Sequence, residues 1–243
     1  MNTKLMNTSL GLILVMLVVS ACGVIPVPGS RTIISENRNV SGFDRLQVNG
    51  GGDLTVIQDG TEALNIETDD NVMPYVTSRV QDGTLTIGLE FPGLRSVIPS
   101  RLRLTLHVRD LSGLSTSGSW SVTSASLQAG SLDIAVSGSG KVTIRSLTAD
   151  KLTVDISGSG EMDLAGKVRS QDVSISGSGS YNAGDLQTLD TRVAVSGSGN
   201  VTTWVTGSLD AGISGMGTIS YYGSPQVAFN QSGAGKIKSL GNR

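Results

Sequence analysis

Apolar and polar residues alternate one by one along most of this chain, from about residue 40 onward. The clearest case is Arg101 to Val108, in which every second residue is Leu or Val and the residues between them are polar. Alternation with a period of two is typical of a β-strand with one buried face. The dipeptides Asp59-Gly60 and Asp82-Gly83 indicate turns between such strands, and Pro74 predicts a loop or a short helical turn around residues 71–75. The pattern therefore predicts an all-β protein.

A four-residue motif, Ser-Gly-x-Gly, recurs in the second half of the chain at intervals of 18 to 20 residues. After a cruder copy at residues 117–120, it stands at Ser137–Gly140, Ser157–Gly160, Ser176–Gly179, Ser196–Gly199, Ser214–Gly217 and Ser232–Gly235. β-branched residues keep a fixed distance from each motif, and those directly before it are Val136, Ile156, Ile175, Val195 and Ile213. The chain therefore contains a structural repeat of about 20 residues.

This combination of period-two alternation and a 20-residue repeat predicts a right-handed parallel β-helix with Ser-Gly-x-Gly corners. A helical repeat would need apolar residues at 3.6 spacing, and a propeller blade needs about twice the length. In a β-helix, equivalent residues of successive coils stack about 4.8 Å apart, so apolar columns at fixed offsets form a continuous core. Because Asn49–Gly52 obeys the same alternation, we expect the N-terminal half to join the stack, giving roughly ten coils over about 45–50 Å.

A solenoid must hide its last core layers, so we expect caps at both ends of the stack. Four aromatic residues fall in the last coils, and we expect them to cap the C-terminal end: Trp204, Tyr221, Tyr222 and Phe229. The alternative for these aromatic residues is an exposed binding patch.

The N-terminus predicts an exported lipoprotein. Residues 1–21 are interpreted as a signal peptide, with Lys4 before an apolar run from Leu10 to Ala21 that is too short to span a membrane comfortably. Cys22, the only cysteine, follows Val-Ser-Ala in a pattern that resembles the bacterial lipobox, so we expect it to be lipidated and to anchor the protein to a membrane. The alternative is an ordinary secretory signal with an incidental cysteine. The expected location is the bacterial cell envelope, outside the cytoplasmic membrane.

The mature chain divides into a tether and one domain. Residues 22–39, with Pro26, Pro28 and Gly29, are interpreted as the lipidated cysteine and a tether, and residues 40–243 as a single β-helix domain. The alternative for the tether is an added edge strand that uses Thr32, Ile33 and Ile34.

Three segments and the corner motifs resemble a bacterial family. The segments are Phe43–Val56, Asp69–Val76 and Asp82–Ile87, and with the Ser-Gly-x-Gly ladder they resemble the family called putative auto-transporter adhesin, head GIN domain, from about Phe43 to Lys238. The chain departs from the family in having Gly50-Gly51-Gly52 where Gly-Ser-Gly is usual. The resemblance implies an exported protein or lipoprotein with a β-helix-like fold, and it carries over no catalytic residue.

Charge and composition narrow the chemistry. The formal net charge is −2 with both signs scattered, so a nucleic-acid partner is not expected. His107, the only histidine, lies on the polar face of a predicted strand, and a Ser-His-Asp site or a zinc site built on it would lack further ligands. We expect no cofactor, no metal and no catalytic residue.

Two groups of carboxylates are candidate sites. Asp133, Asp155, Asp172 and Asp210 point outward from the predicted ladder, at separations that an inverting glycosidase could use, but Thr153 and Arg192 interrupt their column. A solvated face, with Lys141 beside Glu161, is the favoured interpretation. Asp69, Asp70 and Asn71, with Asp53 upstream, offer oxygen ligands for calcium, but we favour a role in capping turns.

These observations predict a lipid-anchored envelope protein that binds, adheres or scaffolds without catalysis, with a surface glycan or a protein as its partner. The alternative is a carbohydrate-active enzyme, a polysaccharide hydrolase or lyase, on the same β-helix scaffold.

Overall fold

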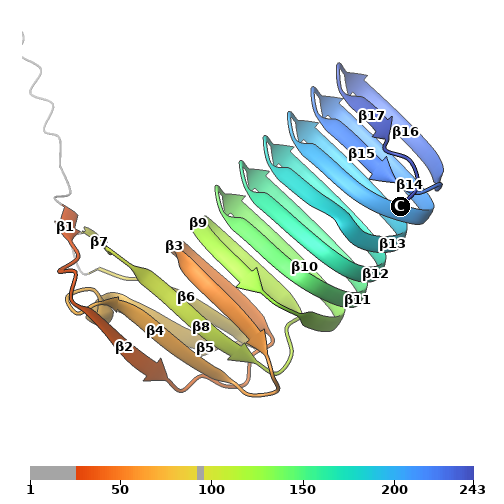
Figure 1. Ribbon diagram of the computed structural model, residues 1–243. Coiled ribbons are helices and arrows are strands. Elements are labelled where there is room, and N and C mark those ends of the chain that lie inside the picture. Colours follow the sequence, from red (N-terminus) through yellow and green to blue (C-terminus); the bar gives the residue numbers. More distant parts are fainter. Residues whose placement is uncertain (1–25, 92–95) are drawn as a thin grey trace, which may run out of the picture.

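The computed structural model describes residues 26–91 and 96–243, and this part of the chain is almost entirely β-structure (Figure 1). The N-terminal strands are β1 (Pro26–Pro28), β2 (Ile33–Arg38), β3 (Arg45–Gln58), β4 (Ala63–Asp69), β5 (Val76–Gln81), β6 (Thr84–Leu89), β7 (Ser96–Ile98) and β8 (Leu102–Val108). The strands of the repeat are β9 (Gly113–Ser124), β10 (Leu127–Gly138), β11 (Lys141–Gly158), β12 (Glu161–Gly177), β13 (Ser180–Gly197), β14 (Asn200–Gly215), β15 (Thr218–Tyr222), β16 (Gln226–Gly233) and β17 (Lys236–Ser239).

The repeat folds as predicted, into a β-solenoid of about six turns. Each long strand follows most of one coil and pairs in parallel with its neighbours, so that the first serines of the corner motifs stand in register, as in the pair Ser157 and Ser176. The same register continues through Ser196, Ser214 and Ser232. The fold class expected from the sequence is confirmed.

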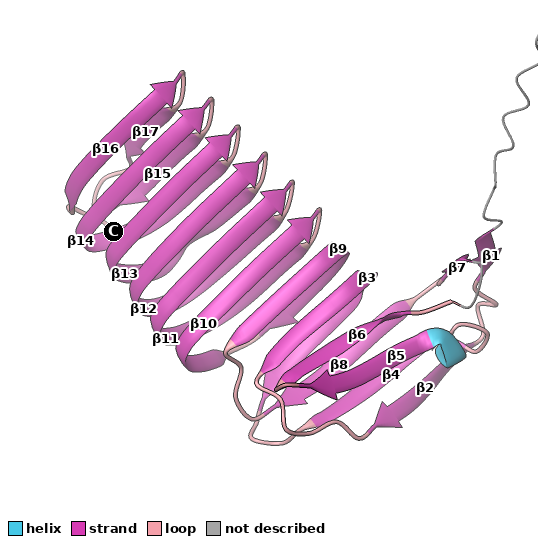
Figure 2. Ribbon diagram, turned by 180° about the vertical axis from the view of Figure 1, so that it is seen from behind, coloured by secondary structure: helices cyan, strands magenta, loops and turns pink. Residues whose placement is uncertain are grey.

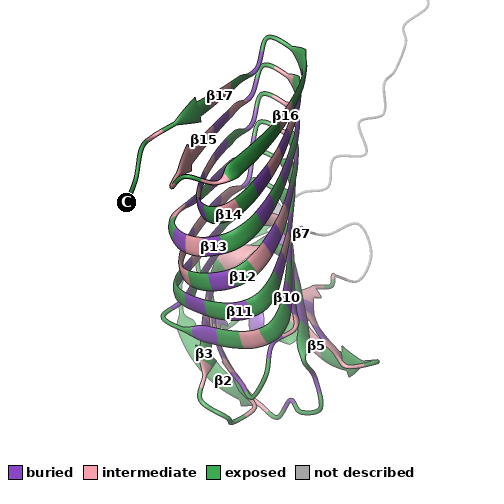
Figure 3. Ribbon diagram, turned by 90° about the vertical axis from the view of Figure 1, so that its right-hand side faces the viewer, coloured by how far each residue is buried: buried purple, intermediate pink, exposed green. Residues whose placement is uncertain are grey.

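The predicted apolar columns form the solenoid core. Val136, Ile156, Ile175, Val195 and Ile213 pair one above the other, and each is at most 3% exposed. Figure 3 shows the resulting alternation of buried and exposed residues around each coil. Because these side chains are β-branched, they fill the pleated interior with little loss of rotamer freedom.

The first glycine of the corner motif is required by the stacking of the coils. Gly177 has φ +120°, and a Cβ on it would lie 2.6 Å from the carbonyl oxygen of Gly158 in the coil beneath. The same oxygen accepts a hydrogen bond of 2.8 Å from the N–H of Ser178. A side chain at Gly177 would therefore meet both backbone strain and a backbone atom that is held in place.

The last glycine of each motif makes room for the core. A Cβ on Gly179 would lie 2.5 Å from Cγ2 of Ile156, and Gly199 stands in the same relation to Ile175 at 2.7 Å. The Ser-Gly-x-Gly spacing is thus explained by two different contacts, one with backbone and one with a buried side chain.

The interior is not purely aliphatic, which the sequence pattern did not predict. Tyr181 and Gln171 are buried, and the Tyr181 hydroxyl donates to Gln171 Oε1 at 2.6 Å. Gln171 Nε2 donates in turn to the Thr203 hydroxyl at 2.6 Å. Burial raises the pKa of Tyr181, so the hydroxyl stays a donor. Tyr181, Gln171 and Thr203 thus satisfy one another, as a low-polarity interior requires.

The expectation that the whole N-terminal half joins the stack, to give about ten coils, is wrong. β3 does pair in parallel with β9, with Gly50 beside Gly118. Beyond it, however, β2 with β4, β4 with β8, and β5 with β6 are antiparallel. One local reason is the turn between β5 and β6, where Asp82 and Gly83, with φ of 49° and 74°, form a two-residue hairpin turn that reverses the chain, whereas β2, β4 and β8 pair antiparallel across long separations in the sequence.

Part of the expected tether is also corrected. Residues 33–38 form β2, an edge strand antiparallel to β4, so the alternative interpretation holds for this segment. Residues 26–28 form β1, which pairs in parallel with β7. The interruption at Pro74 is confirmed as a 3₁₀ turn, Met73–Tyr75, between β4 and β5 (Figure 2). Residues 1–25, including Cys22, lie outside the described residues.

Candidate functional site: a serine-lined trough

One outward face of the solenoid carries two neighbouring columns of mostly small residues. The first column contains the serines of the corners: Ser157, Ser176, Ser196, Ser214 and Ser232. The second column, two residues earlier in each coil, contains Asp155, Ser174, Ala194, Gly212 and Asn230. Outward positions of a strand normally carry long polar side chains, so this run of small residues leaves the sheet surface bare.

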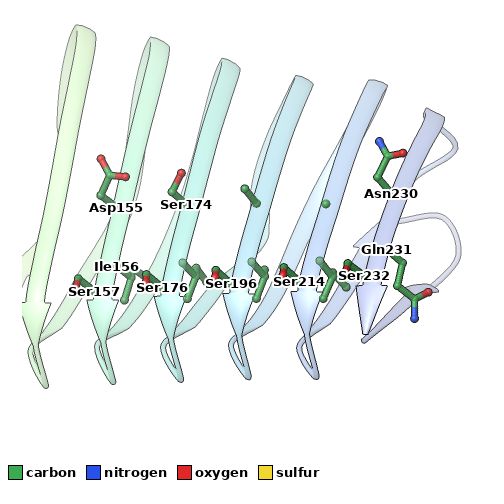
Figure 4. Close-up of a pocket in the computed structure, with 15 residues that line it drawn as sticks. Asp155, Ile156, Ser157, Ser174, Ser176, Ser196, Ser214, Asn230, Gln231 and Ser232 are labelled. Carbon is green, nitrogen blue, oxygen red and sulfur yellow. The ribbon is translucent and has the colours of Figure 1, made fainter. Parts of the chain in front are cut away.

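A shallow cavity of about 630 Å³ lies over these columns and crosses β11, β12, β13, β14 and β16. Its floor includes the residues between the columns, Ile156, Ile175, Val195 and Ile213, whose side chains point into the core and leave their backbone to line the surface. Figure 4 shows the serines in one line, with Asp155 and Asn230 at opposite ends of the second column. We call this surface the serine trough.

The serine trough can bind but has little means of catalysis. Its hydroxyls repeat about every 4.8 Å along the stack, and each can donate one hydrogen bond and accept others. Among the lining residues Asp155 is the only titratable group. General acid–base chemistry usually needs two positioned groups, so the geometry suits recognition of an elongated ligand that runs along the solenoid.

The outward acids do not form a catalytic pair. Asp133 and Asp172 share a column with Thr153 between them, and Asp155 belongs to the neighbouring column. Arg192 follows Asp172 and forms an ion pair of 3.2 Å with Asp210. Lys141 lies 2.9 Å from Glu161, as predicted, and 2.8 Å from Asp163. These acids therefore belong to a charged, solvated face.

His107 pairs with an acid but has no nucleophile on its other side in the described structure. Its Nδ1 lies 2.7 Å from Asp59 Oδ2, while the Thr61 hydroxyl donates to the other oxygen of Asp59 at 2.7 Å. The hydrogen bond from Thr61, followed by that of His107, lowers the pKa of Asp59 to about 2. The threonine hydroxyl is directed at the acid rather than at the imidazole, so the three residues form no nucleophile–base relay.

The residues considered as calcium ligands hold the N-terminal segment in place. Asp69 is buried and accepts hydrogen bonds from the backbone N–H of Arg31 and Ser100, both 2.7 Å, and from the Ser100 hydroxyl at 2.6 Å. Asp70 accepts a hydrogen bond of 2.5 Å from the Ser30 hydroxyl. Burial by itself would raise the pKa of Asp69, but the hydrogen bonds from Ser100 and Arg31 outweigh it and lower that pKa.

These oxygen atoms therefore cap backbone groups, which agrees with the favoured interpretation. Asn71 Oδ1 likewise accepts from the N–H of Ser30 at 2.9 Å. Asp53, the fourth candidate, lies exposed on β3. Within residues 26–91 and 96–243, no group of three or more His, Cys, Asp or Glu side chains is placed to hold a metal ion.

The late aromatic residues divide into two pairs. Tyr221 and Phe229 are partly buried against the core of the last coils, but they leave its final layer open at Val227. Trp204 and Tyr222 instead pair side by side on the outside, where the Arg243 guanidinium lies 6.0 Å and 5.1 Å from their ring centres. The expectation that all four close the end of the stack is therefore wrong for Trp204 and Tyr222.

The inward columns of the repeat do not predict the serine trough, although the outward columns carry a signal for it. Aligning the outward residues in the same way shows three small ones in succession, Ser174, Ala194 and Gly212. That these positions form a hollow depends on their neighbours, which only the structure places.

A parallel solenoid with a bare, hydroxyl-lined face defines a class of rigid scaffold whose repeated surface is suited to binding. More particularly, the chain belongs to the family described as putative auto-transporter adhesin, head GIN domain, whose model matches residues 42–225. This confirms the resemblance noted in the sequence.

Solved structures show the same fold. A putative adhesin from Bacteroides fragilis is 29% identical, with a TM-score of 0.83, over 88% of this chain and 100% of that one. A putative lipid binding protein from Parabacteroides distasonis (24% identity, TM-score 0.73, 89% and 100% covered) and a putative adhesin from Parabacteroides merdae (24%, 0.71, 88% and 98%) share the fold. No curated protein matches the chain. In the described residues, no helix has the length and apolar character needed to cross a bilayer.

Proposed function

We propose that this protein is a lipid-anchored binding protein of the cell envelope that adheres through its solenoid and takes its ligand in the serine trough. The adhesin family and the similarity to an adhesin structure support the adhesive role. The observation that carries the proposal is the trough itself, a hollow with one charged group and a line of hydroxyls that spans five strands. A repeated, uncharged line of hydrogen-bond donors and acceptors favours an elongated ligand over a compact one. We therefore propose a surface glycan as the ligand.

The anchor is proposed from the lipobox-like sequence before Cys22. We expect the wild-type chain to fractionate with membranes and Cys22→Ser to appear in the soluble envelope fraction, because an acyl chain contributes about 0.8 kcal/mol for each buried CH₂. The measurement is envelope fractionation followed by immunoblotting, with Ser20→Ala as the control beside the cysteine. Unchanged membrane retention of Cys22→Ser would contradict lipidation.

A substitution that fills the trough tests the binding site. Ala194 is exposed in the middle of the second column, and Ala135 is an outward residue of the same column that does not line the trough. We expect Ala194→Arg to reduce glycan-array binding by about tenfold or more, since the long side chain would occupy the hollow and displace the ligand. Ala135→Arg, which adds the same charge, should bind like wild type.

Two results of the same assay oppose the proposal. Equal glycan binding by both variants would place the site elsewhere, and binding of no glycan would favour a protein ligand. Cleavage of acidic polysaccharide by the wild type that is abolished in Asp155→Asn would replace the adhesive role by the enzymatic alternative.

A further inference from the structure

Exposed large apolar side chains gather at the N-terminal end of the molecule, and one more lies at the C-terminal end. Nine such residues occur in the described part of the chain, and six of them lie at the ends: Val27, Ile33, Ile34, Val80 and Ile98 at the N-terminal end and Val227 at the C-terminal end. Figure 1 shows that these ends, with β1, β2, β5 and β7 at one and β16 and β17 at the other, are the far ends of one elongated body. Apolar residues grouped in this way mark interaction surfaces.

The C-terminal coil is left open. Within the described chain, β16 pairs only with β14 and β17 only with β15, so each has a free edge. Val227 continues the core column of Leu209, yet its exposed fraction is 42% whereas that of Leu209 is 1%. Phe229, above the buried Ala211, is only partly buried. The last core layer therefore lacks a covering coil, and its backbone donors and acceptors are unpaired.

The N-terminal end also presents free edges on both faces of the body. β2 pairs only with β4, and β5 only with β6, among the described strands. Ile33 and Ile34 on β2 are 38% and 40% exposed, and Val80 on β5 is 37% exposed. Each end thus offers two strand edges with apolar side chains.

The edges at the two ends match in position. One face is formed by the strand segments that follow each corner, and its parallel pairing runs from β17 back to the second half of β3 and then to β8. β8 pairs with β4 and β4 with β2, so this sheet ends at β2. The other face is formed by the segments that precede each corner, and it has β16 at its C-terminal end. Toward the N-terminus, the first half of β3 pairs with β6 and β6 pairs with β5, so this sheet ends at β5. One face therefore has the free edges of β17 and β2, and the other has those of β16 and β5.

The strand directions match as well. β2 is antiparallel to β4 and β4 is antiparallel to β8, so β2 runs in the same direction as β8. β8 is parallel to β3, and all pairs from β3 to β17 on this face are parallel. A second copy displaced along the stack would therefore place its β2 parallel to β17, and its β5 antiparallel to β16, without being turned over.

Charge distinguishes this arrangement from a symmetric one. Residues 211–243 contain three basic residues, Lys236, Lys238 and Arg243, and no acid, whereas residues 26–112 contain eleven acidic and eight basic residues. Neither Lys236 nor Lys238 forms an ion pair with another described residue. Two C-terminal ends would bring lysines together across a two-fold axis, whereas the C-terminal segment and the N-terminal region as a whole have net charges of opposite sign; of the docking strands themselves, β2 carries Glu36 and Arg38 and β5 carries Arg79.

We propose that copies of this chain associate head to tail, with β2 and β5 of one copy docking on β17 and β16 of the next. The contact extends both faces of the solenoid, covers the open core layer at Val227 and Phe229, and leaves a free edge at each end for further copies. A heterologous contact of this kind yields open chains rather than a closed dimer. The proposal concerns assembly and does not depend on the ligand of the serine trough.

Cross-linking distinguishes the possible arrangements. In the full chain with Cys22→Ser, so that no other thiol is present, Ser239→Cys marks the edge of β17 and Asn37→Cys marks the edge of β2. We expect a short bis-maleimide to link an equimolar mixture of the two variants at least fivefold more than either variant alone. Linking of Ser239→Cys alone to the same extent would show a symmetric C-terminal dimer and overturn the proposal, as would the absence of linking in the mixture.

Sedimentation velocity tests the role of charge. We expect the Cys22→Ser chain to form concentration-dependent oligomers, and the change Lys236→Glu with Lys238→Glu to weaken their association about tenfold at low salt. Lys151→Glu with Lys167→Glu reverses the same charge on exposed residues in the middle of the solenoid and should leave the association unchanged. A monomer at every concentration, or equal weakening by both pairs of changes, would overturn the proposal. Circular dichroism of each variant separates these outcomes from misfolding.

Discussion

Replacing Gly177 by alanine is expected to lower the free energy of unfolding by about 3 kcal/mol, because two costs add at this corner. The backbone has φ +120°, a conformation that is nearly restricted to glycine, and the new methyl group would lie 2.6 Å from the Gly158 carbonyl oxygen. That oxygen cannot move away freely, since it already accepts the hydrogen bond from Ser178. The same geometry recurs at Gly158 and Gly197, so the coils can relax only together.

Urea denaturation followed by circular dichroism measures this cost. Gly130→Ala is the matched control, because Gly130 lies in β10, outside the left-handed region, with nothing within 4 Å of the new methyl group. There we expect no loss, or a gain of about 0.4–1 kcal/mol from the less flexible unfolded chain. A loss of less than about 1 kcal/mol at Gly177 would show that the corners are not the constraint that sets the coil spacing.

Replacing Asp69 by asparagine is expected to cost about 3 kcal/mol at neutral pH. The buried carboxylate accepts hydrogen bonds from the backbone of Arg31 and Ser100 and from the Ser100 hydroxyl, and bonds to a charged group contribute about 1.5–3 kcal/mol each. Asparagine keeps the size but replaces one acceptor oxygen by a donor that would face these donors. Asp70→Asn is the control, because Asp70 is exposed and accepts one hydrogen bond, from Ser30.

The pH dependence of stability separates the charge of Asp69 from its shape. Its pKa in the folded protein is lower than the ordinary value of 3.8, so its contribution is present above that value and is lost as pH falls through the lower, folded pKa. The difference in unfolding free energy between wild type and Asp69→Asn, measured in urea, should therefore be large at pH 7 and shrink below about pH 4. A difference that stays constant from pH 7 to pH 3 would contradict this account.

Local rules explain why the repeat could be predicted. The columns through Ile156 and Ile175 depend only on a period of two within each strand and of about 20 residues between coils. The corner glycines depend on contacts between equivalent positions, such as Gly177 with Gly158. Because every coil repeats the same contacts, one correct alignment of the sequence predicts all of them.

The N-terminal region could not be predicted in the same way, because its strands find partners far apart in the chain. Alternating residues alone do not distinguish a parallel pairing, such as that of β6 with β3, from an antiparallel one, such as that of β6 with β5. The hairpin turn at Asp82-Gly83 was visible in the sequence, but which strands it would place at the edge was not.

The sequence by itself determined the all-β composition, the inward face of each strand and the register of the coils, because these follow from short periods and from where glycine stands. Only the tertiary structure decided where the solenoid stops, which edges remain free and that small outward residues form a hollow. These features depend on the neighbours that each residue meets in space. Ala194 lies in the trough and Val227 lies in the open core layer, although apolar and polar residues alternate in the same way in both of their strands.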